Sequence, residues 1–294
     1  MILVVGGASA GHNIPAQIMG NVLKEAGFDV TFYNPKEKVA WRDVKAVLAT
    51  GSRKSLPMAL QAKLRGKKLI LHEQNVIPGR ANRFMAGMAD QIFLAFEESR
   101  VFFHSRDWNK LTFVGMPVRE PTTDAEELKK KMRVRKPLLL VTGGSQGSAF
   151  LNFFTKHVLM DLRDKYFIVH QCGSLEDERF MNSYIRAQTL PDLQNYVAAA
   201  DVVIARSGSS TLHECLHFGT QAIFFPMAHS TDRHQWANAE VFRQKYGYPF
   251  FWEHVVKPSE VISQVEEFLT KGRRNPVEVF DSAAFVEAVG RVIS

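Results

Sequence analysis

Cysteine is scarce in this chain of 294 residues, which contains only Cys172 and Cys215. The surrounding patterns predict that one lies in a buried strand and the other in a buried helix. The two cysteines form no C-x-x-C pair and have no partners at metal-ligand spacing. We therefore expect a reducing compartment, no structural zinc and no other metal site.

Long apolar runs are also missing. No apolar stretch approaches the length needed to span a membrane, and the first apolar run, Ile2–Val5, ends at Gly6. That run is too short for a signal peptide, and no basic region precedes it. Together with the cysteine usage, this predicts a cytoplasmic protein.

Acidic residues are in the minority, and the net charge is +7. Such a balance suits nucleic acid, an anionic membrane or a phosphorylated substrate. No recognition motif or aromatic-basic stripe accompanies the charge, so we expect no nucleic acid partner. The basic run at 129–136 is typical of a solvated face. The helical segment Leu56–Arg65 combines basic and apolar residues, which fits either an anionic membrane surface or a helix packed on a sheet.

Short apolar runs alternate with helical periodicity along the whole chain, which predicts an α/β fold with parallel sheets covered on both faces. Strands are expected at Ile2–Val5, Val30–Tyr33, Ala46–Ala49, Lys68–Leu71, Ile92–Ala95, Leu111–Val114, Leu138–Thr142, Phe167–His170, Val202–Ala205 and Ala222–Phe225. Helices are expected at Pro15–Ala26, Leu56–Arg65, Gly79–Gly87, Ser148–Leu162, Leu193–Ala199, Ser210–Phe218, Asp232–Lys245 and Pro258–Thr270.

The alternation pauses over residues 116–136, which combine two prolines, turn formers and a charge run. We place a domain boundary there, giving Rossmann-like domains at 1–120 and 121–294, with the last helix able to cross back to the first domain. Each domain opens with a strand and a glycine-rich turn. Ligands of open α/β sheets bind beyond the carboxyl ends of the strands, so a cleft between two facing domains is the expected site.

The two glycine-rich turns, VVGGASAGH and LLVTGGSQGS, lack the G-x-G-x-x-G spacing and the Lys-Ser/Thr ending of a P-loop. The second turn still offers an anion site, because Ser145 and Gln146 carry side-chain donors and Ser148 can begin the next helix. A plain strand-to-helix turn would account for the same residues.

The segment ADVVIARSGSSTLHE places a turn and a helix start after a buried strand. A diphosphate at Ser209, Ser210 and Thr211 would meet several unpaired N–H groups and the positive end of the helix dipole. Glu214, one turn further, is placed to accept hydrogen bonds from two ribose hydroxyls. The alternative is a capping box, since Thr211 and Glu214 have the required spacing.

Two further polar segments follow predicted strands. In MAHSTDRHQWANAE, Asp232 is expected to cap a helix whose first turns carry His234, Gln235 and Asn238, either to bind sugar hydroxyls or as an exposed polar helix start. His229 and His234 lack the spacing of a metal pair. In HEQN, residues 72–75, four polar residues end a strand, and we favour site lining over a hydrogen-bonded loop network.

Together these segments resemble the MurG-type N-acetylglucosaminyltransferases of peptidoglycan synthesis, over almost the whole chain. GASAGHNIPA resembles that family's G-G-T-G-G-H-x-x-P loop, HEQNVIPGRANR its H-E-Q-N-x-x-x-G-x-x-N segment and VGMPVR its G-N-P-V-R. GGSQGSAFLN, ARSGSSTLHE and DRHQWANA resemble the donor-side motifs. Six motifs in the family's order make a chance similarity improbable.

The resemblance implies a GT-B fold and a metal-independent, inverting transfer of N-acetylglucosamine, without a cofactor. The donor would be UDP-N-acetylglucosamine and the acceptor lipid I, giving lipid II on the anionic inner face of the cell membrane. By motif, Glu214 would hold ribose, Leu190 uracil and Arg119 the nucleotide. The remaining donor contacts would come from Ser145, Gln146, Ser209, Ser210, Thr211, His234, Gln235 and Asn238. The acceptor contacts would come from Ser9, Gly11 and Asn75.

The resemblance also gives His12 a role. Inverting transfer needs a base for the acceptor hydroxyl, and the imidazole of a histidine suits that task. Capping of its own helix and binding of the acceptor phosphate are the alternatives.

The acceptor-side motifs depart from the family. Ala8 and Ala10 replace glycines, and Ser9 replaces a threonine. The loop G-G-Y-x-S-G-P survives only as residues 50–57, and the segment between the strands at 30–33 and 46–49 is short. Three alternatives therefore stay open: another acceptor for the same donor, a UDP-N-acetylglucosamine epimerase, and a non-catalytic sugar-nucleotide-binding subunit.

Overall fold

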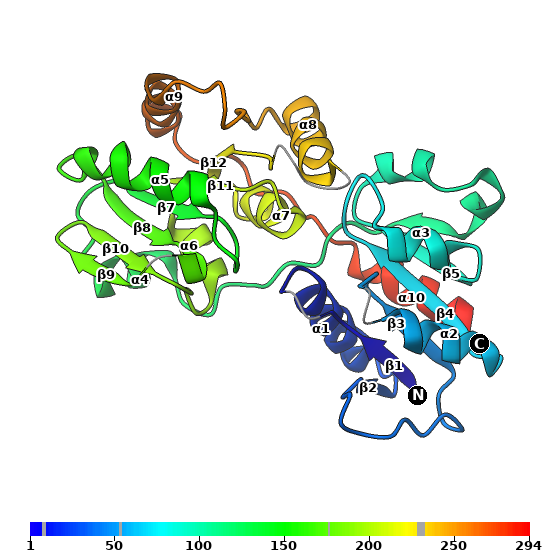
Figure 1. Ribbon diagram of the computed structural model, residues 1–294. Coiled ribbons are helices and arrows are strands. Elements are labelled where there is room, and N and C mark those ends of the chain that lie inside the picture. Colours follow the sequence, from blue (N-terminus) through cyan, green and yellow to red (C-terminus); the bar gives the residue numbers. More distant parts are fainter. Residues whose placement is uncertain (8–9, 53–54, 176, 228–232) are drawn as a thin grey trace. The chain divides into compact units, whose positions relative to one another are not determined.

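The computed structural model describes residues 1–7, 10–52, 55–175, 177–227 and 233–294 (Figure 1). The chain divides into two compact units. Unit 1 comprises Met1–Val118 and Glu278–Ser294, and unit 2 comprises Arg119–Val277. The division lies two residues before the boundary expected from the sequence, and the final segment belongs to unit 1.

Unit 1 is built on a parallel sheet that has six strands within the described residues, in the order β2-β1-β3-β4-β5-β6. Its strands are β1 (Ile2–Val5), β2 (Val30–Phe32), β3 (Ala46–Ala49), β4 (Lys68–Glu73), β5 (Gln91–Leu94) and β6 (Leu111–Phe113). Neighbouring residues of β1 face opposite sides: Leu3 packs in one core cluster and Val4 in another. Both faces are buried, which explains why these strands are continuous apolar runs.

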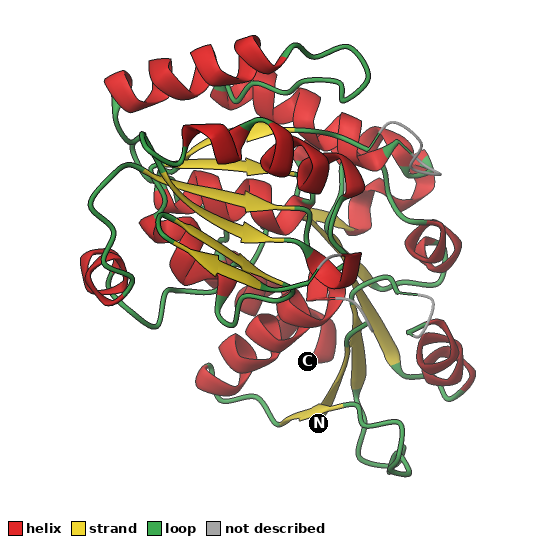
Figure 2. Ribbon diagram, turned by 60° about the vertical axis from the view of Figure 1, so that its left-hand side comes forward, coloured by secondary structure: helices red, strands yellow, loops and turns green. Residues whose placement is uncertain are grey.

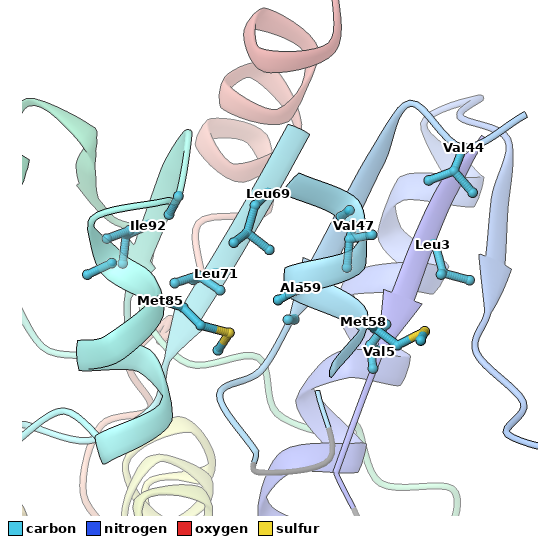
Figure 3. Packing of buried hydrophobic residues seen from close by; sticks show 14 of the residues in the cluster. Leu3, Val5, Val44, Val47, Met58, Ala59, Leu69, Leu71, Met85 and Ile92 are labelled. Carbon is cyan, nitrogen blue, oxygen red and sulfur yellow. The ribbon is translucent and has the colours of Figure 1, made fainter. Parts of the chain in front are cut away.

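Helices cover both faces of the first sheet. They are α1 (Ala10–Glu25), α2 (Leu56–Leu64), α3 (Arg80–Ala86) and α10 (Ser282–Ile293), with 3-10 turns η1 (Glu97–Phe102) and η2 (Ser105–Lys110). On one face, Met58 and Ala59 of α2 and Met85 of α3 pack over Val47 and Leu71 (Figure 3). Helices α1 and α10 cover the opposite face.

Helix α10 is joined to this core by aromatic packing. The Phe285 ring meets Phe93 of β5 edge-on, with ring centroids 4.9 Å apart. The chain returns to unit 1 beside Gly115, whose φ is +81° and where a Cβ would lie 1.9 Å from the Val279 carbonyl oxygen. The Met116 N–H donates to that oxygen at 2.8 Å. Gly115 therefore permits the close approach that anchors the returning segment.

Unit 2 repeats the plan, and Figure 2 shows sheets in yellow with helices in red packed on them. The sheet order is β12-β11-β7-β8-β10-β9 within the described residues, parallel except for β9. The strands are β7 (Leu138–Thr142), β8 (Phe167–Gln171), β9 (Arg179–Met181), β10 (Tyr184–Ala187), β11 (Val202–Ala205) and β12 (Gln221–Phe224). The helical elements are α4 (Ala125–Lys131), α5 (Ala149–His157), η3 (Leu159–Leu162), η4 (Gly173–Leu175), α6 (Leu193–Ala199), α7 (Ser209–Phe218), α8 (His234–Tyr246) and α9 (Pro258–Lys271).

The predicted strands are all present, but several elements differ from expectation. Helix α1 begins at Ala10 and contains Pro15, which was expected to open it. The single helix expected after Ser148 is interrupted at Val158, between α5 and η3. Strands β9 and β10 and helix α4 were not predicted. Helix α4 has no buried residue and is capped by Asp124, which fits the solvated face expected for the run at 129–136.

Helix α2 is a packed helix, not a free amphipathic one. Met58, Ala59 and Ala62 are buried in the unit 1 core, and Lys63 pairs with Asp90 at 2.8 Å. The sheet therefore covers most of its apolar face, although Leu64 is 85% exposed, and this favours the packed helix, one of the two alternatives that the sequence left open. Within the described ranges, no helix is both long and apolar enough to cross a membrane.

The packing of α10 against the first sheet predicts that its buried Phe285 side chain contributes strongly to stability. Phe285→Ala removes a fully buried ring from the unit 1 core and should lower the free energy of unfolding by about 3–5 kcal/mol. Chemical denaturation followed by circular dichroism measures the change. Glu287→Ala, on the exposed side of the same helix, is the matched control and should cost less than about 1 kcal/mol. Equal losses in both variants would contradict this packing.

Candidate active site

His12 lies in the first turn of α1 and is fixed to the end of β3. Its Nδ1 lies 2.7 Å from the Thr50 carbonyl oxygen, and the Thr50 hydroxyl donates to the His12 carbonyl oxygen at 2.9 Å. A carbonyl oxygen can only accept, so Nδ1 carries the proton and Nε2 of the neutral ring keeps its lone pair. This is the tautomer that a general base at Nε2 requires.

The glycine-rich turn before α1 leaves room for this arrangement. A Cβ at Gly7 would lie 2.6 Å from the His12 Cβ and 2.9 Å from the Ser52 Cβ, so only glycine fits there without a shift. Gly11 is exposed at the start of α1 and faces open space. Ser9, expected to contact the acceptor, lies outside the described residues.

The polar run after β4 is organised by one buried carboxylate, that of Glu73. Its Oε1 accepts hydrogen bonds from Asn75 N at 2.8 Å and Asn75 Nδ2 at 3.3 Å. Its Oε2 accepts from Asn82 Nδ2 at 2.8 Å and Gly79 N at 3.0 Å. Burial raises the Glu73 pKa, and these donors together with the charge of His12 oppose that rise. Glu73 therefore fixes the whole turn from β4 into α3.

His72 and Gln74 are buried in the same network. His72 Nε2 lies 3.0 Å from the Gly115 carbonyl oxygen, and Gln74 Nε2 lies 3.2 Å from His72 Nδ1. Burial lowers the His72 pKa to about 4, which keeps the ring neutral. The expectation that this run lines a site is wrong for residues 72–74, because their partners are internal. Asn75 alone is half-buried, with its amide oriented by Glu73.

In unit 2, the turn between β7 and α5 is shaped by glycines. A Cβ at Gly147, where φ is +77°, would lie 2.1 Å from the Cys172 carbonyl oxygen. Ser148 caps α5, its Oγ accepting from the Leu151 N–H at 3.3 Å, as expected from the sequence. Ser145 and Gln146 are exposed between these points. The turn is therefore held from both ends while its tip remains accessible.

The start of α7 lies at the same edge of the second sheet. Together with the turn before α5 it forms what we call the unit 2 half-site. Leu212 donates the first intrahelical hydrogen bond, to Gly208 O at 3.1 Å. The N–H groups of Ser209, Ser210 and Thr211 precede it and have no acceptor within the helix. The ten-residue helix adds a positive dipole end at the same place. These groups can bind an anion without a metal.

Glu214 lies one turn inside α7 and is only 4% exposed. No described residue donates a hydrogen bond to its carboxylate, and burial raises its pKa to about 7 although Arg119 has the opposite effect. The capping-box interpretation is wrong, because the N-cap is Gly208 and Thr211 already lies inside the helix. A buried carboxylate that receives no hydrogen bond from the described residues can accept hydrogen bonds from a ligand.

Two arginines lie close to this helix start. Arg119 interacts electrostatically with Glu214, and its Nε is buried with no partner in the described part of the chain. Arg206, which the sequence did not suggest as a site residue, directly follows β11 and precedes the turn. It donates to Phe225 O at 3.1 Å and to Glu253 Oε2 at 2.9 Å. Its position after a buried strand and before Ser207-Gly208 was the available signal.

Leu190 follows β10 at the same sheet edge. Its N–H donates to Gln171 Oε1 at 3.0 Å, so the side chain of Gln171 fixes this backbone segment. Gln171 ends β8 and gave no motif by which the sequence could identify it. If Leu190 contacts a ligand through its backbone, its carbonyl oxygen is the group left to do so.

Helix α8 begins at His234, after Arg233 in the left-handed conformation. The Gln235 carbonyl oxygen accepts from the Ser207 hydroxyl at 2.9 Å, and its Oε1 accepts from Met227 N at 3.1 Å. Asn238 is fully buried. The helix start is therefore tied to the turn before α7. His229 and the expected cap Asp232 lie outside the described residues.

The structure thus gathers the candidate donor residues at one edge of the second sheet, at the carboxyl ends of β7, β10, β11 and β12. His12 and Asn75 lie at the corresponding edge of the first sheet, after β1 and β4. In the portion of the chain that the structure describes, no group of three His, Cys, Asp or Glu side chains could hold a metal ion.

Comparison with known proteins identifies matching domains in both units. Residues 138–287 match the glycosyltransferase family 28 C-terminal domain, and residues 36–94 match the glycosyltransferase family 28 N-terminal domain. The first match alone spans about half of the chain.

Curated relatives carry one name, UDP-N-acetylglucosamine–N-acetylmuramyl-(pentapeptide) pyrophosphoryl-undecaprenol N-acetylglucosamine transferase. The protein from Aquifex aeolicus is 28% identical over 322 residues, covering 92% of both chains. The protein from Caldicellulosiruptor saccharolyticus is 35% identical over 242 residues, covering 77% of this chain and 64% of the relative.

Solved structures show the same fold. Acinetobacter baumannii MurG aligns with a TM-score of 0.69 at 20% identity, covering 99% of this chain and 98% of that one. The glycosyltransferase SnogD from Streptomyces nogalater aligns with a TM-score of 0.66 at 10% identity, covering 99% of this chain and 95% of SnogD. Two Rossmann-like units of this kind constitute the GT-B fold, as expected from the sequence. On the evidence of its domain matches, the chain belongs to glycosyltransferase family 28.

Proposed function

We propose that this protein transfers N-acetylglucosamine, with inversion, from UDP-N-acetylglucosamine to the 4-hydroxyl of the N-acetylmuramoyl-pentapeptide of lipid I, giving lipid II. The names of the curated relatives support this reaction. The observation that carries the donor assignment is the buried, unpartnered carboxylate of Glu214 beside a helix start that can bind phosphate.

The donor fits the unit 2 half-site group by group. Glu214 accepts hydrogen bonds from the two ribose hydroxyls, and the Leu190 carbonyl oxygen accepts from the uracil N3–H. The start of α7 holds the diphosphate, assisted by the exposed tip at Ser145 and Gln146. Arg119 contributes positive charge next to the nucleotide. The sugar hydroxyls are bound by His234, Gln235 and Asn238.

His12 is the proposed general base. As the acceptor oxygen attacks C1 of N-acetylglucosamine, Nε2 takes the hydroxyl proton and the bond from C1 to the UDP oxygen breaks. The imidazolium so formed keeps its Nδ1–H bond to the Thr50 carbonyl oxygen. The negative charge on departing UDP is stabilised by the N–H groups and dipole of α7, without a metal or cofactor.

The acceptor assignment depends on unit 1. Asn75, whose amide is oriented by Glu73, is the proposed contact to the lipid-linked diphosphate sugar, together with Gly11. Ser9, the third residue expected to contact the acceptor, lies outside the described residues. Ala8 and Ala10 stand where the family has glycines, and alanine permits fewer backbone conformations than glycine. An acceptor other than lipid I is the second candidate, because these departures fall on the acceptor side.

A lipid-linked acceptor requires contact with a membrane, and we propose that the protein binds peripherally to the anionic inner face of the cell membrane, on its cytoplasmic side. Unit 1 exposes large apolar side chains on the elements that follow the Asn75 turn. Phe84 on α3 is 63% exposed and Val101 on η1 is 72% exposed, with Phe102, Trp108 and Phe113 also exposed.

The elements that carry this apolar face are in contact with one another and with the acceptor side. Lys110 Nζ donates to Gly87 O at 3.4 Å, which joins η2 to the end of α3. The Ser99 hydroxyl of η1 donates to Asn75 O at 2.9 Å. Exposed Arg80, Arg83, Arg100 and Arg106 on these elements favour an anionic lipid surface.

Removing the base should separate binding from chemistry. His12→Ala should lower turnover by roughly a hundredfold or more, the usual scale of lost general-base catalysis, and leave the Kd for UDP-N-acetylglucosamine within about twofold. Transfer of labelled N-acetylglucosamine to a lipid I analogue and calorimetric titration measure the two quantities. His254→Ala, at an exposed histidine of unit 2, is the control.

The same assay distinguishes the alternatives. Turnover within about fivefold of the native protein in His12→Ala would contradict the base assignment. Release of UDP without any acceptor would favour an epimerase, and donor binding without turnover on lipid I would favour another acceptor or a non-catalytic subunit.

Glu214→Gln should have opposite effects on binding and on stability. Because burial raises its pKa from 4.5 to about 7, Glu214 costs the folded protein no stability below about pH 4.5, an increasing amount as the pH rises to about 7, and roughly 3 kcal/mol above that pH. The amide removes that cost, so the variant should be more stable than the native protein at pH 8 and equally stable near pH 4. It should also bind UDP-N-acetylglucosamine at least about tenfold more weakly at pH 8.

Thermal melts and calorimetric titrations at both pH values test this pair of effects. Glu178→Gln, at an exposed carboxylate of unit 2, should change neither quantity. Unaltered donor affinity in Glu214→Gln would exclude the ribose contact.

The membrane proposal predicts that Phe84→Ser combined with Val101→Ser weakens binding to vesicles of anionic phospholipid by about tenfold or more, because two apolar side chains no longer enter the interface. Co-sedimentation measures the partition. Phe180→Ser, at a comparably exposed ring of unit 2, is the control. Equal partition of the native protein and the double variant would exclude this face.

A further inference from the structure

The chain enters unit 2 through residues 119–122, here called the strap, which begins with Arg119 and is held against α6. The Thr122 N–H donates to Asn195 Oδ1 at 2.8 Å, and Asn195 Nδ2 donates to Thr122 Oγ1 at 2.9 Å. Asn195 is buried on α6 and connects positions 73 residues apart in sequence. This reciprocal pair fixes the backbone and the side chain of Thr122 together.

A second contact holds the strap against α7. Glu120 Oε1 lies 2.9 Å from Nε2 of His217, whose side chain is largely buried one turn beyond Glu214. His217 Nδ1 is buried and has no partner among the described residues, so the ring's hydrogen bonding is directed at Glu120 alone.

Arg119 directly precedes Glu120, the residue of the strap that contacts His217. Its Nε is buried without a partner in the described residues, so that nitrogen does not fix its orientation. Its electrostatic interaction is with Glu214 on α7. The guanidinium is therefore placed by the backbone that carries it, and that backbone is held by α6 and α7.

The helices that hold the strap are themselves joined. The Thr220 hydroxyl, just after α7, donates to Val197 O of α6 at 2.9 Å. Arg273 Nη1 donates to Ala200 O and its Nη2 to Phe218 O, at 2.9 and 2.8 Å. The two anchor points therefore belong to one supported surface.

We propose that Asn195 and His217 are positioning residues, which hold the strap so that Arg119 stays beside Glu214 and the nucleotide of the bound donor. This rests on the proposed function, since it assigns the strap a role in donor binding. Both residues are assigned to act through Arg119, not by binding the donor directly. The sequence motifs identified Arg119 but gave no sign of the two side chains that hold it.

A double-mutant cycle on the full chain tests this inference, with the Kd for UDP-N-acetylglucosamine and the split between KM and kcat as readouts. Asn195→Ala should raise Kd and KM at least about fivefold with kcat nearly unchanged. The variant loses only the placement of the Arg119 charge, which contributes equally to binding of the donor before and during the reaction. In an Arg119→Ala background the same substitution should change Kd by less than about twofold, because the group through which it acts is gone.

Two conservative variants and one control guard against a merely structural effect. Asn195→Asp keeps an acceptor for the Thr122 N–H and His217→Gln keeps a donor for Glu120, so both should bind the donor nearly as the native protein does. Thr155→Val removes a buried hydrogen bond to the Leu151 carbonyl oxygen inside α5, a helix that takes no part in holding the strap, and should leave KM unchanged.

The outcomes separate this inference from the proposed function. A native protein that fails to bind UDP-N-acetylglucosamine would overturn the proposed function and the role of the strap with it. A native protein that binds, with fully additive effects of Asn195→Ala and Arg119→Ala, would overturn the strap alone.

Discussion

The Glu214 carboxylate is removed from water without a hydrogen-bond donor in the described part of the chain, and the chemistry of unit 2 follows from that arrangement. Burial of a charge without a partner is costly, and the pKa near 7 expresses that cost. The packing of helix α7 holds the Glu214 side chain in this buried position, and the start of the same helix offers N–H groups that have no acceptor within the helix. A ligand that supplies hydroxyls to the carboxylate and an anion to the helix start satisfies both at once. A nucleoside diphosphate sugar has both.

In unit 1, by contrast, the buried Glu73 carboxylate receives hydrogen bonds from neighbouring residues at both of its oxygens. Four hydrogen bonds reach the Glu73 carboxylate, while His72 contacts the Gly115 carbonyl oxygen through Nε2 and the Gln74 amide through Nδ1. Asn75 and His12 are both half-exposed at this edge of the sheet. His12 is oriented by the Thr50 carbonyl oxygen, which selects the tautomer with a free lone pair on Nε2. In the proposed function, Glu214 of unit 2 accepts hydrogen bonds from the donor nucleotide, and His12 of unit 1 accepts the proton of the acceptor hydroxyl.

Much of this could be predicted from the sequence because parallel strands buried on both faces are uninterrupted apolar runs. Those runs located the strands, and the residues directly after them located the turns that carry the candidate site. The order of the motifs then indicated the family. The sequence also marked the charge run at 129–136 as a solvated face, although it did not predict α4, the helix that carries the start of this run.

The remainder depends on contacts between distant residues, which local patterns do not contain. The spacing of Thr211 and Glu214 fits a capping box, but the helix begins earlier, at Ser209, so the same spacing describes two residues inside it. The polar run at 72–75 gives no sign that Asn82 and Gly79 complete the shell of Glu73. Strands β9 and β10 are short and partly exposed, and α10 is placed by Phe285 meeting Phe93, far away in sequence.

The most direct test of this account is the ionisation of Glu214 itself, followed by carbon-13 NMR of selectively labelled glutamate side chains, with Glu214→Gln used to assign the signal. The account predicts a pKa near 7 in the free protein, falling by at least about one unit when UDP-N-acetylglucosamine binds, because the ribose hydroxyls stabilise the charged form. An ordinary pKa near 4.5 in the free protein, or a pKa that does not move on saturation with the donor, would contradict it.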